Sequence, residues 1–328
     1  MGNIVSIAVS ALLPAISSIE SGVCRAIIFV VCCGPLHVSL AQSQSSPPSA
    51  GEARPTAFIA GQSTFGKNGF IEYVVGNLPV VISVPHGGYL KPSTIPDRVL
   101  GTAGHQDTNT QELAREIVEV FRTQTGKVPH LIINRLHRDK LDANRELFDA
   151  AQDDPIASEV WNEFHGFIDT AEQRIQREFG KGLYIDLHGH RHEWQVIELG
   201  YLLVSNQLKL SDAELDASVQ PATTSLGLIP KDRTTLLSQL VRGPRSLGAA
   251  LEQEGFATVP SPAHPHPDGH PYFSGGYNLE QHSAFSGRNA WGIQVELPTG
   301  IRDDDTRRHI FAAAFVKSVI GFLSNIRE

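Results

Sequence analysis

Three histidines stand close together in the segment LYIDLHGHRHEWQ, residues 183–195. The segment opens on an apolar run typical of a buried strand, which would place His188 at the strand end. Because side chains alternate along a strand, Asp186, His188 and His190 would share one face. An imidazole beside a carboxylate is a common arrangement of a metal ligand and the group that orients it. We therefore predict His188 as a metal ligand with Asp186 and His190 next to it; a solvated polar loop is the alternative.

Two further residues of ligating type, His86 and Asp107, come after the apolar run at residues 80–84. His86 follows this run closely in VISVPHGG, where two glycines remove side-chain bulk, so its imidazole would project beyond the strand end. Asp107 stands just before a helical pattern, where aspartate also serves as an N-cap. The alternatives are a turn histidine for His86 and a helix cap for Asp107, and His105 competes with Asp107 as a ligand.

The segment WGIQVELPTGIR, residues 291–302, alternates apolar and polar side chains over its strand-like part. Gln294 and Glu296 therefore face one side of a strand in apolar surroundings. Burying a lone carboxylate is costly unless it is paired or has a function. Glu296 is thus a candidate general base, and the alternative is a pair with an arginine on an exposed face of the sheet.

Arginines gather in RLHRDKLDANREL, residues 135–147. A guanidinium group is a rigid fork that donates two hydrogen bonds to one carboxylate. Asn144 and Arg145 are therefore candidates for binding a substrate carboxylate. Taken without the other motifs, residues 135–147 would be interpreted more simply as a solvated charged loop.

The composition narrows the classes of protein and of metal site. The chain has 328 residues and a net charge of −8 with no compensating basic run, which argues against a nucleic-acid binder. All three cysteines, at positions 24, 32 and 33, precede residue 42. A metal site in the rest of the chain must therefore use histidine, aspartate, glutamate or water.

Residues 1–41 read as a secretory signal peptide. A basic residue precedes a short apolar core, and Ser39 and Ala41 give the small-x-small pattern of a cleavage site. Residues 42–56, which contain several serines and prolines, would form a flexible linker. We expect a secreted or periplasmic protein, and a membrane-anchored one only if the leader is retained. N-myristoylation at Gly2 is a further alternative.

Apolar strand patterns alternate with amphipathic helical patterns over residues 57–328, which predicts a single α/β domain with a largely parallel or mixed sheet. Strands are expected at 80–84, 128–134, 182–189, 194–205 and 291–298, and helices at 107–126, 154–180, 243–255 and 304–324. Residues 260–289 are too rich in glycine, proline and histidine for regular structure and would form a functional or disordered loop. In open α/β sheets, ligands bind beyond the carboxyl ends of the strands, where the candidate residues stand.

The chain resembles the N-formylglutamate amidohydrolase family in six motifs, which occur in the family's order. They are PHGG at 85–88, Asp107 before a helix, DANR at 142–145, DLHG at 186–189, PYFSGGY at 271–277 and IQVEL at 293–297. The resemblance implies a three-layer α/β fold of the zinc-exopeptidase (phosphorylase/hydrolase-like) type, with a mixed sheet flanked by helices. It also implies one Zn²⁺ per chain held by His86, Asp107 and His188, with Glu296 as general base.

The same resemblance implies hydrolysis of an amide bond in a small carboxylate-bearing substrate, such as an N-acyl amino acid like N-formylglutamate. Asn144 and Arg145 would hold the carboxylate, and the loop 264–277, with Tyr277, would close over the site. The expected partner is this small molecule, and no nucleic acid is expected. The alternatives are an exported metallopeptidase or ester hydrolase on the same site, and a non-catalytic metal-binding module.

Overall fold

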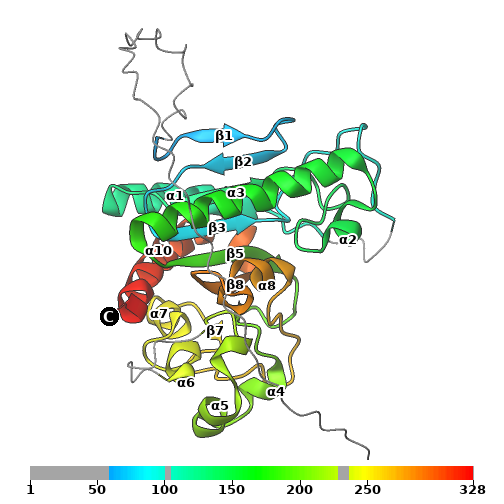
Figure 1. Cartoon of the computed structure of the whole chain (residues 1–328). Helices are drawn as coiled ribbons and strands as arrows, with labels where there is room; N and C mark the ends of the chain where they lie inside the picture. The colour runs from blue at the N-terminus through cyan, green and yellow to red at the C-terminus, as the bar shows by residue number, and fades with distance from the viewer. Residues whose placement is uncertain (1–58, 100–104, 228–235, 328) are drawn as a thin grey trace, which may run out of the picture. The chain divides into compact units, whose positions relative to one another are not determined.

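A mixed sheet of eight strands runs through the part of the chain that the computed structural model describes, residues 59–99, 105–227 and 236–327 (Figure 1). The strands are β1 (Ser63–Phe65), β2 (Ile71–Val74), β3 (Val80–Val84), β4 (His130–Asn134), β5 (Gly182–His190), β6 (Ile197–Gly200), β7 (Thr258–Val259) and β8 (Ala290–Pro298). They lie in the order β1-β2-β4-β3-β5-β8-β6-β7. The predicted leader, residues 1–41, and linker, residues 42–56, lie outside the described residues.

The four central strands run parallel, and every residue in them except Gly189 is buried. β4 pairs with β3, β3 with β5, and β5 with β8. Strands that are covered on both faces read as near-continuous apolar runs, which is why the sequence located them to within about two residues. The strands β1, β2 and β6 make the antiparallel pairs, so the sheet is mixed. The sequence did not predict the short strands β1, β2 and β7.

Along the described sequence, helices alternate with the strands, and the last two helices follow β8 (Figure 1). The helices are α1 (Thr110–Thr125), α2 (Leu147–Ala151), α3 (Pro155–Phe179), α4 (Ser205–Leu208), α5 (Asp212–Ser218), α6 (Leu237–Val241), α7 (Leu247–Gln253), α8 (Tyr277–His282), α9 (Thr299–Arg302) and α10 (Asp305–Arg327). The longest, α3, begins where the sequence predicted it. Asp154 caps it by accepting a hydrogen bond from the backbone N–H of Ala157, and Pro155 occupies the first turn.

Helices cover both faces of the sheet, which gives three layers. One apolar core joins α1 and α10 to Val80, Ile82 and Val84 of β3. A second core joins α3, and Leu279 of α8, to Val81 of the same strand. Because neighbouring residues of a strand point to opposite faces, the two cores lie on opposite sides of the sheet. The predicted three-layer mixed α/β fold is confirmed.

Part of the segment 260–289 is regular structure, contrary to the prediction of a loop. It contains α8, and a 3-10 turn, η2, follows at Ala284–Ser286. The reason is one apolar anchor, because Leu279 is fully buried in the core on the α3 side of the sheet. The composition of the surrounding stretch obscured this anchor.

The helix α10 is long and apolar enough to cross a membrane by length and composition, but half of its apolar window is buried within the fold. Phe311, Phe315 and Val319 belong to the core that α10 shares with α1 and the sheet. Packing against the sheet therefore accounts for the apolar composition of this helix.

The carboxyl ends of β3, β5 and β8 meet at one edge of the sheet. Ser83 of β3 pairs with Asp186 of β5, and His188 of β5 pairs with Glu296 of β8. His86 follows β3 by two residues. The parallel register therefore brings the candidate residues of three separate segments to the same place.

Candidate metal centre and active site

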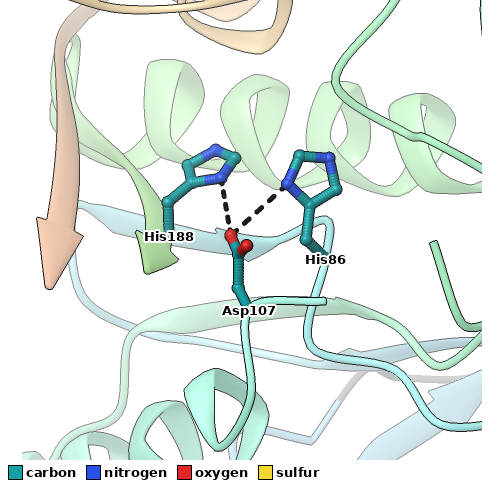
Figure 2. A group of neighbouring side chains, drawn as sticks. All are labelled: His86, Asp107 and His188. Carbon is teal, nitrogen blue, oxygen red and sulfur yellow. Dashed lines mark hydrogen bonds and ion pairs between the residues drawn. The ribbon is translucent and has the colours of Figure 1, made fainter. Parts of the chain in front are cut away.

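His86, Asp107 and His188 converge at this edge of the sheet (Figure 2). Nδ1 of His86 lies 3.4 Å from Oδ2 of Asp107, and Nδ1 of His188 lies 3.2 Å from the same oxygen. All three residues are buried. Two imidazole nitrogens and one carboxylate at this spacing form a group that is able to hold a metal ion.

Each imidazole is held from behind by a buried aspartate. Nε2 of His86 lies 2.6 Å from Oδ1 of Asp142, and Nε2 of His188 lies 2.7 Å from Oδ2 of Asp186. A carboxylate accepts a hydrogen bond, so each Nε2 is the donor and each Nδ1 turns a lone pair towards Asp107. Nδ1 of His86 is buried without a hydrogen-bond partner among the described residues. A cation between these three acceptors would satisfy them all.

Charge at the centre favours a positive group. Burial alone would lower the pKa of His188, but the carboxylates of Asp186 and Asp107 raise it well above the ordinary value. Burial would raise the pKa of Asp107, but the adjacent imidazoles of His188 and His86 hold it far below its usual range. Either a proton or a metal ion supplies the positive charge that this arrangement favours.

The sequence offered two roles for Asp107, and the structure separates them. The N-cap of α1 is Asn109, and no side-chain hydrogen bond caps the helix. Oδ2 of Asp107 instead accepts a hydrogen bond from the backbone N–H of Gly189 at 3.1 Å. Its carboxylate therefore faces the two imidazoles and does not cap the helix.

Asp142 joins the centre to the arginines, a contact that sequence reasoning missed. Its Oδ1 accepts from His86, and its Oδ2 accepts from Nε of Arg138 at 3.0 Å and from Nε of Arg145 at 3.3 Å. Arg98 lies 3.7 Å away on the same oxygen. The sequence signal was a lone Asp inside the motif DANR. One buried carboxylate thus orients an imidazole and two guanidinium groups.

Glu296 lies on the cavity side of β8, buried and opposite His188. Its Oε1 accepts a hydrogen bond from Nε2 of Gln294 at 3.0 Å, as expected for side chains two residues apart on a strand. Burial raises the pKa of Glu296 to about 8. Within the described residues it forms no ion pair with an arginine, so the alternative of an exposed pair is wrong.

A cavity of about 360 Å³ opens onto the convergent side chains. It is lined by His86, Asp107, Arg138, Asn144, Arg145, Glu146, Asp149, His188, Gly189, Phe273, Gly275, Gly276, Tyr277, Glu280, Gln294 and Glu296. Asn144 lies on the inner wall, where its Oδ1 accepts from the backbone N–H of Asn278 and its amide nitrogen lies 3.3 Å from Nε2 of His188. Arg145 is partly exposed at the rim. All residues predicted for catalysis, ligation and substrate binding thus meet in one cavity.

His190 does not join this group through a side-chain hydrogen bond, although it was predicted to stand beside the ligands. Its Nε2 donates to the carbonyl of Val196 at 2.8 Å, and its Nδ1 accepts from the backbone N–H of His192 at 3.1 Å. Asp186, predicted with it, does contact His188. The alternation along β5 predicted the correct face of the strand for His190. Both of its ring nitrogens, however, form hydrogen bonds with the backbone of residues 192–196.

The segment before α8 forms a wall of the cavity and is bonded to β6. The backbone N–H of Phe273 donates to Oε2 of Glu198 at 2.8 Å, and the hydroxyl of Tyr272 donates to the carbonyl of Leu199 at 2.6 Å. The backbone N–H of Leu202 donates to the carbonyl of Ser274 at 2.7 Å. Three hydrogen bonds therefore hold the predicted closing loop, two of them to β6 and one to Leu202 just after it.

Arg302 joins the carboxyl ends of β5 and β8 by hydrogen bonds, and the sequence did not predict this role. Arg302 is fully buried and donates to the backbone carbonyls of Leu297, His190 and Thr108. A Cβ atom at Gly189 would lie 2.2 Å from Nε of Arg302. The glycine of DLHG is therefore required by the close approach of this arginine.

Solved structures of other proteins resemble this fold. An N-formylglutamate amidohydrolase from Ralstonia eutropha JMP134 is 14% identical, with a TM-score of 0.46 over 76% of this chain and 96% of its own. An Agrobacterium tumefaciens gene product is 14% identical, with a TM-score of 0.45 over 77% and 93%. An N-acetylmuramyl-L-alanine amidase from Mycobacterium abscessus is 14% identical, with a TM-score of 0.33 over 74% and 98%.

The first of these is from the family that the motifs resemble. No model of a protein family matches the sequence, and no curated protein matches it. Structural similarity at this level says nothing of activity, so a function has to rest on the geometry of the site.

Replacing Gly189 with alanine should destabilise the fold by about 1–3 kcal/mol, because the added methyl group overlaps Arg302 in a filled core. Urea unfolding measures this change. The control is Gly166→Ala in α3, where nothing lies within 4 Å of the added Cβ and the free energy of unfolding should rise by roughly 0.5–1 kcal/mol. Equal stabilities for Gly189→Ala and the unmodified chain would contradict the role of Arg302.

Proposed function

We propose that the chain is a metal-dependent hydrolase that cleaves an amide bond in a small substrate carrying a carboxylate. One observation carries the proposal. Two imidazole Nδ1 atoms and the carboxylate of Asp107 converge in a cavity, and a buried aspartate orients each imidazole. The buried Glu296 lies opposite His188 on the neighbouring strand.

His86, Asp107 and His188 would hold the metal. Two neutral imidazoles and one carboxylate suit Zn²⁺, and three protein ligands leave a position open for water. When bound, zinc supplies Lewis acidity and lowers the pKa of a bound water to about 7. The orphaned Nδ1 of His86 supports this assignment, because it is the atom that a metal ion would engage.

Glu296 would act as the general base, with the positive charge of a bound metal ion opposing the effect of burial and holding its carboxylate ionised. It would accept a proton from the attacking water and then deliver that proton to the nitrogen of the leaving amine. Its position on β8 opposite His188 places it beside the proposed ligands. Gln294 holds one carboxylate oxygen, which leaves the other to face the cavity.

The arginines at the cavity would recognise the substrate carboxylate. Arg138 and Arg145 both line the cavity, and Asp142 fixes each through Nε. The guanidinium edges away from Asp142 can then donate to a carboxylate. Asn144 and Tyr277 complete the wall and would orient the rest of the substrate, an N-acyl amino acid of the N-formylglutamate type. The predicted leader would place this reaction outside the cytoplasm.

Replacing His188 with alanine should remove one equivalent of tightly bound zinc per chain, because two ligands bind zinc far more weakly than three. Elemental analysis of the purified protein after gel filtration measures the loss. His309→Ala is the control, since this imidazole is exposed on α10. If both variants keep the zinc content of the unmodified chain, the proposed metal centre is wrong.

Replacing Glu296 with glutamine should lower kcat by about 10²–10⁴-fold and leave the metal content unchanged, because the amide cannot accept the proton. Steady-state kinetics on N-acyl amino acids, combined with elemental analysis, separates the two effects. The exposed Glu193→Gln serves as control. Turnover close to that of the unmodified enzyme would remove Glu296 from the mechanism.

Replacing Arg145 with alanine should raise KM for a carboxylate-bearing substrate about tenfold, which corresponds to ~1.4 kcal/mol of binding free energy. The matched carboxamide substrate should show no such change, since it lacks the charge that Arg145 would bind. The control variant is Arg177→Ala on the exposed side of α3. An equal rise in KM for both substrates would argue against carboxylate recognition by Arg145.

A further inference from the structure

A second group of ligating side chains lies between α3 and α8. It consists of Asp169 and Glu172 of α3 and His282, the last residue of α8. One ligand atom from each of the three lies within 4.8 Å of the others. None of these residues lines the cavity of the proposed active site.

Helical spacing explains why two of these groups face the same neighbour. Asp169 and Glu172 are three residues apart in α3, and His165 precedes Asp169 by four, so the three lie on one face. This polar face packs against α8. His165 and His282 are both buried, their ring centroids lie 5.1 Å apart, and Nδ1 of His165 is 2.7 Å from Nε2 of His282.

Several atoms of this group are buried without a hydrogen bond. They are Oδ1 of Asp169, both carboxylate oxygens of Glu172 and Nδ1 of His282. His282 is only 2% exposed and the Glu172 side chain only 10%. Leaving such groups unpaired costs several kcal/mol. Nδ1 of His282 lies 3.7 Å from Oδ1 of Asp169, too far for a hydrogen bond, and a cation between this nitrogen and the carboxylates would satisfy them together.

Arg288 supplies only part of the missing charge. Its Nη1 lies 2.9 Å from Oδ1 of Asp169 and 3.4 Å from Oε2 of Glu172. One guanidinium therefore faces two carboxylates, and its side chain is 38% exposed at the edge of the group. Burial raises the pKa of Glu172 to about 8, as expected of a carboxylate with too little positive charge around it.

We propose that Asp169, Glu172 and His282 bind a second divalent cation. Nδ1 of His282 and one oxygen from each carboxylate would be its ligands, and one imidazole with two carboxylates suits Zn²⁺ or Mn²⁺. In this site Nε2 of His282 would be the donor to Nδ1 of His165, 2.7 Å away, which would leave the Nδ1 lone pair of His282 for the metal. Asp169, which is partly exposed, marks the side from which the ion enters.

The site lies at one end of a helix whose other end builds the active site. α8 begins with Tyr277, which lines the catalytic cavity, and Asn278, whose side-chain amide donates to Oδ1 of Asp186 at 3.3 Å. The backbone N–H of Asn278 also donates to Asn144. A cation that joins the last residue of α8 to α3 therefore fixes the helix that positions these groups.

The test measures Mn²⁺ binding to the full chain carrying His188→Ala, so that the first centre does not contribute. Electron paramagnetic resonance of free Mn²⁺ gives the stoichiometry. We expect one saturable equivalent, its loss on adding His282→Gln, and its retention on adding the exposed His309→Gln as control. The melting temperature should also rise with Mn²⁺ in the His188→Ala chain but not in the His188→Ala/His282→Gln chain.

Asp169→Asn, in the same His188→Ala background, is the second variant should His282→Gln fail to fold, and it should weaken Mn²⁺ binding at least tenfold. No saturable binding in the His188→Ala chain would overturn the proposal. Binding that survives both His282→Gln and Asp169→Asn would also overturn it, because the ion would then occupy another place. Neither result bears on the first centre, which the His188→Ala substitution has already removed.

Discussion

The parallel pairing of β5 with β8 sets the positions of His188 and Glu296 at the cavity. It runs from Gly182 opposite Ala290 to His190 opposite Pro298, and it places His188 directly across from Glu296. Because side chains alternate, a slip of one residue would turn Glu296 to the opposite face of the sheet. β3 pairs with the other edge of β5 and brings His86 to the same end. The register of two strand pairs therefore brings these residues together, independently of the hydrogen bonds that their side chains make.

Buried carboxylates then define the chemistry that the site supports. Asp107, Asp142 and Asp186 are nearly fully buried, and each is surrounded by donors. Isolated carboxylates would not remain ionised there, so each fixes the orientation of the imidazole or guanidinium that neutralises it. Asp142 serves the proposed ligand His86 and the proposed substrate-binding arginines together. The same side chain thus orients the proposed metal ligand and the proposed substrate-binding groups.

The sequence predicted those features of the fold and the site that depend on local pattern. Apolar runs located the central strands, and the position of His86 and His188 at strand ends predicted that they would meet. The role of Arg302 has no local pattern, because two of its acceptors, the carbonyls of Thr108 and His190, lie 194 and 112 residues away in the sequence. Contacts of this kind follow from the tertiary arrangement alone.

The errors of prediction have the same origin. His190 was placed on the correct side of β5 by alternation, but its hydrogen bonds depend on how the following loop returns. The helix α8 was hidden in a stretch rich in glycine and proline, since a single buried leucine is too short a signal for periodicity to detect. Asp142 was visible only as a member of a short motif, because its contacts with His86 and Arg98 join segments that are distant in the sequence.

The hydrogen bonds between β6 and the segment around Phe273 have a consequence for how the ligand preference of this cavity would change in evolution. Two of them bind the cavity wall to β6, and a third binds it to Leu202 directly after this strand, so the wall shares the rigidity of the core. Such a wall selects ligands by a preformed shape, and the volumes of Phe273 and Tyr277 set the boundary of that shape. Divergence among relatives with this wall would therefore proceed by exchange of these two side chains, while the length of the segment stays constant.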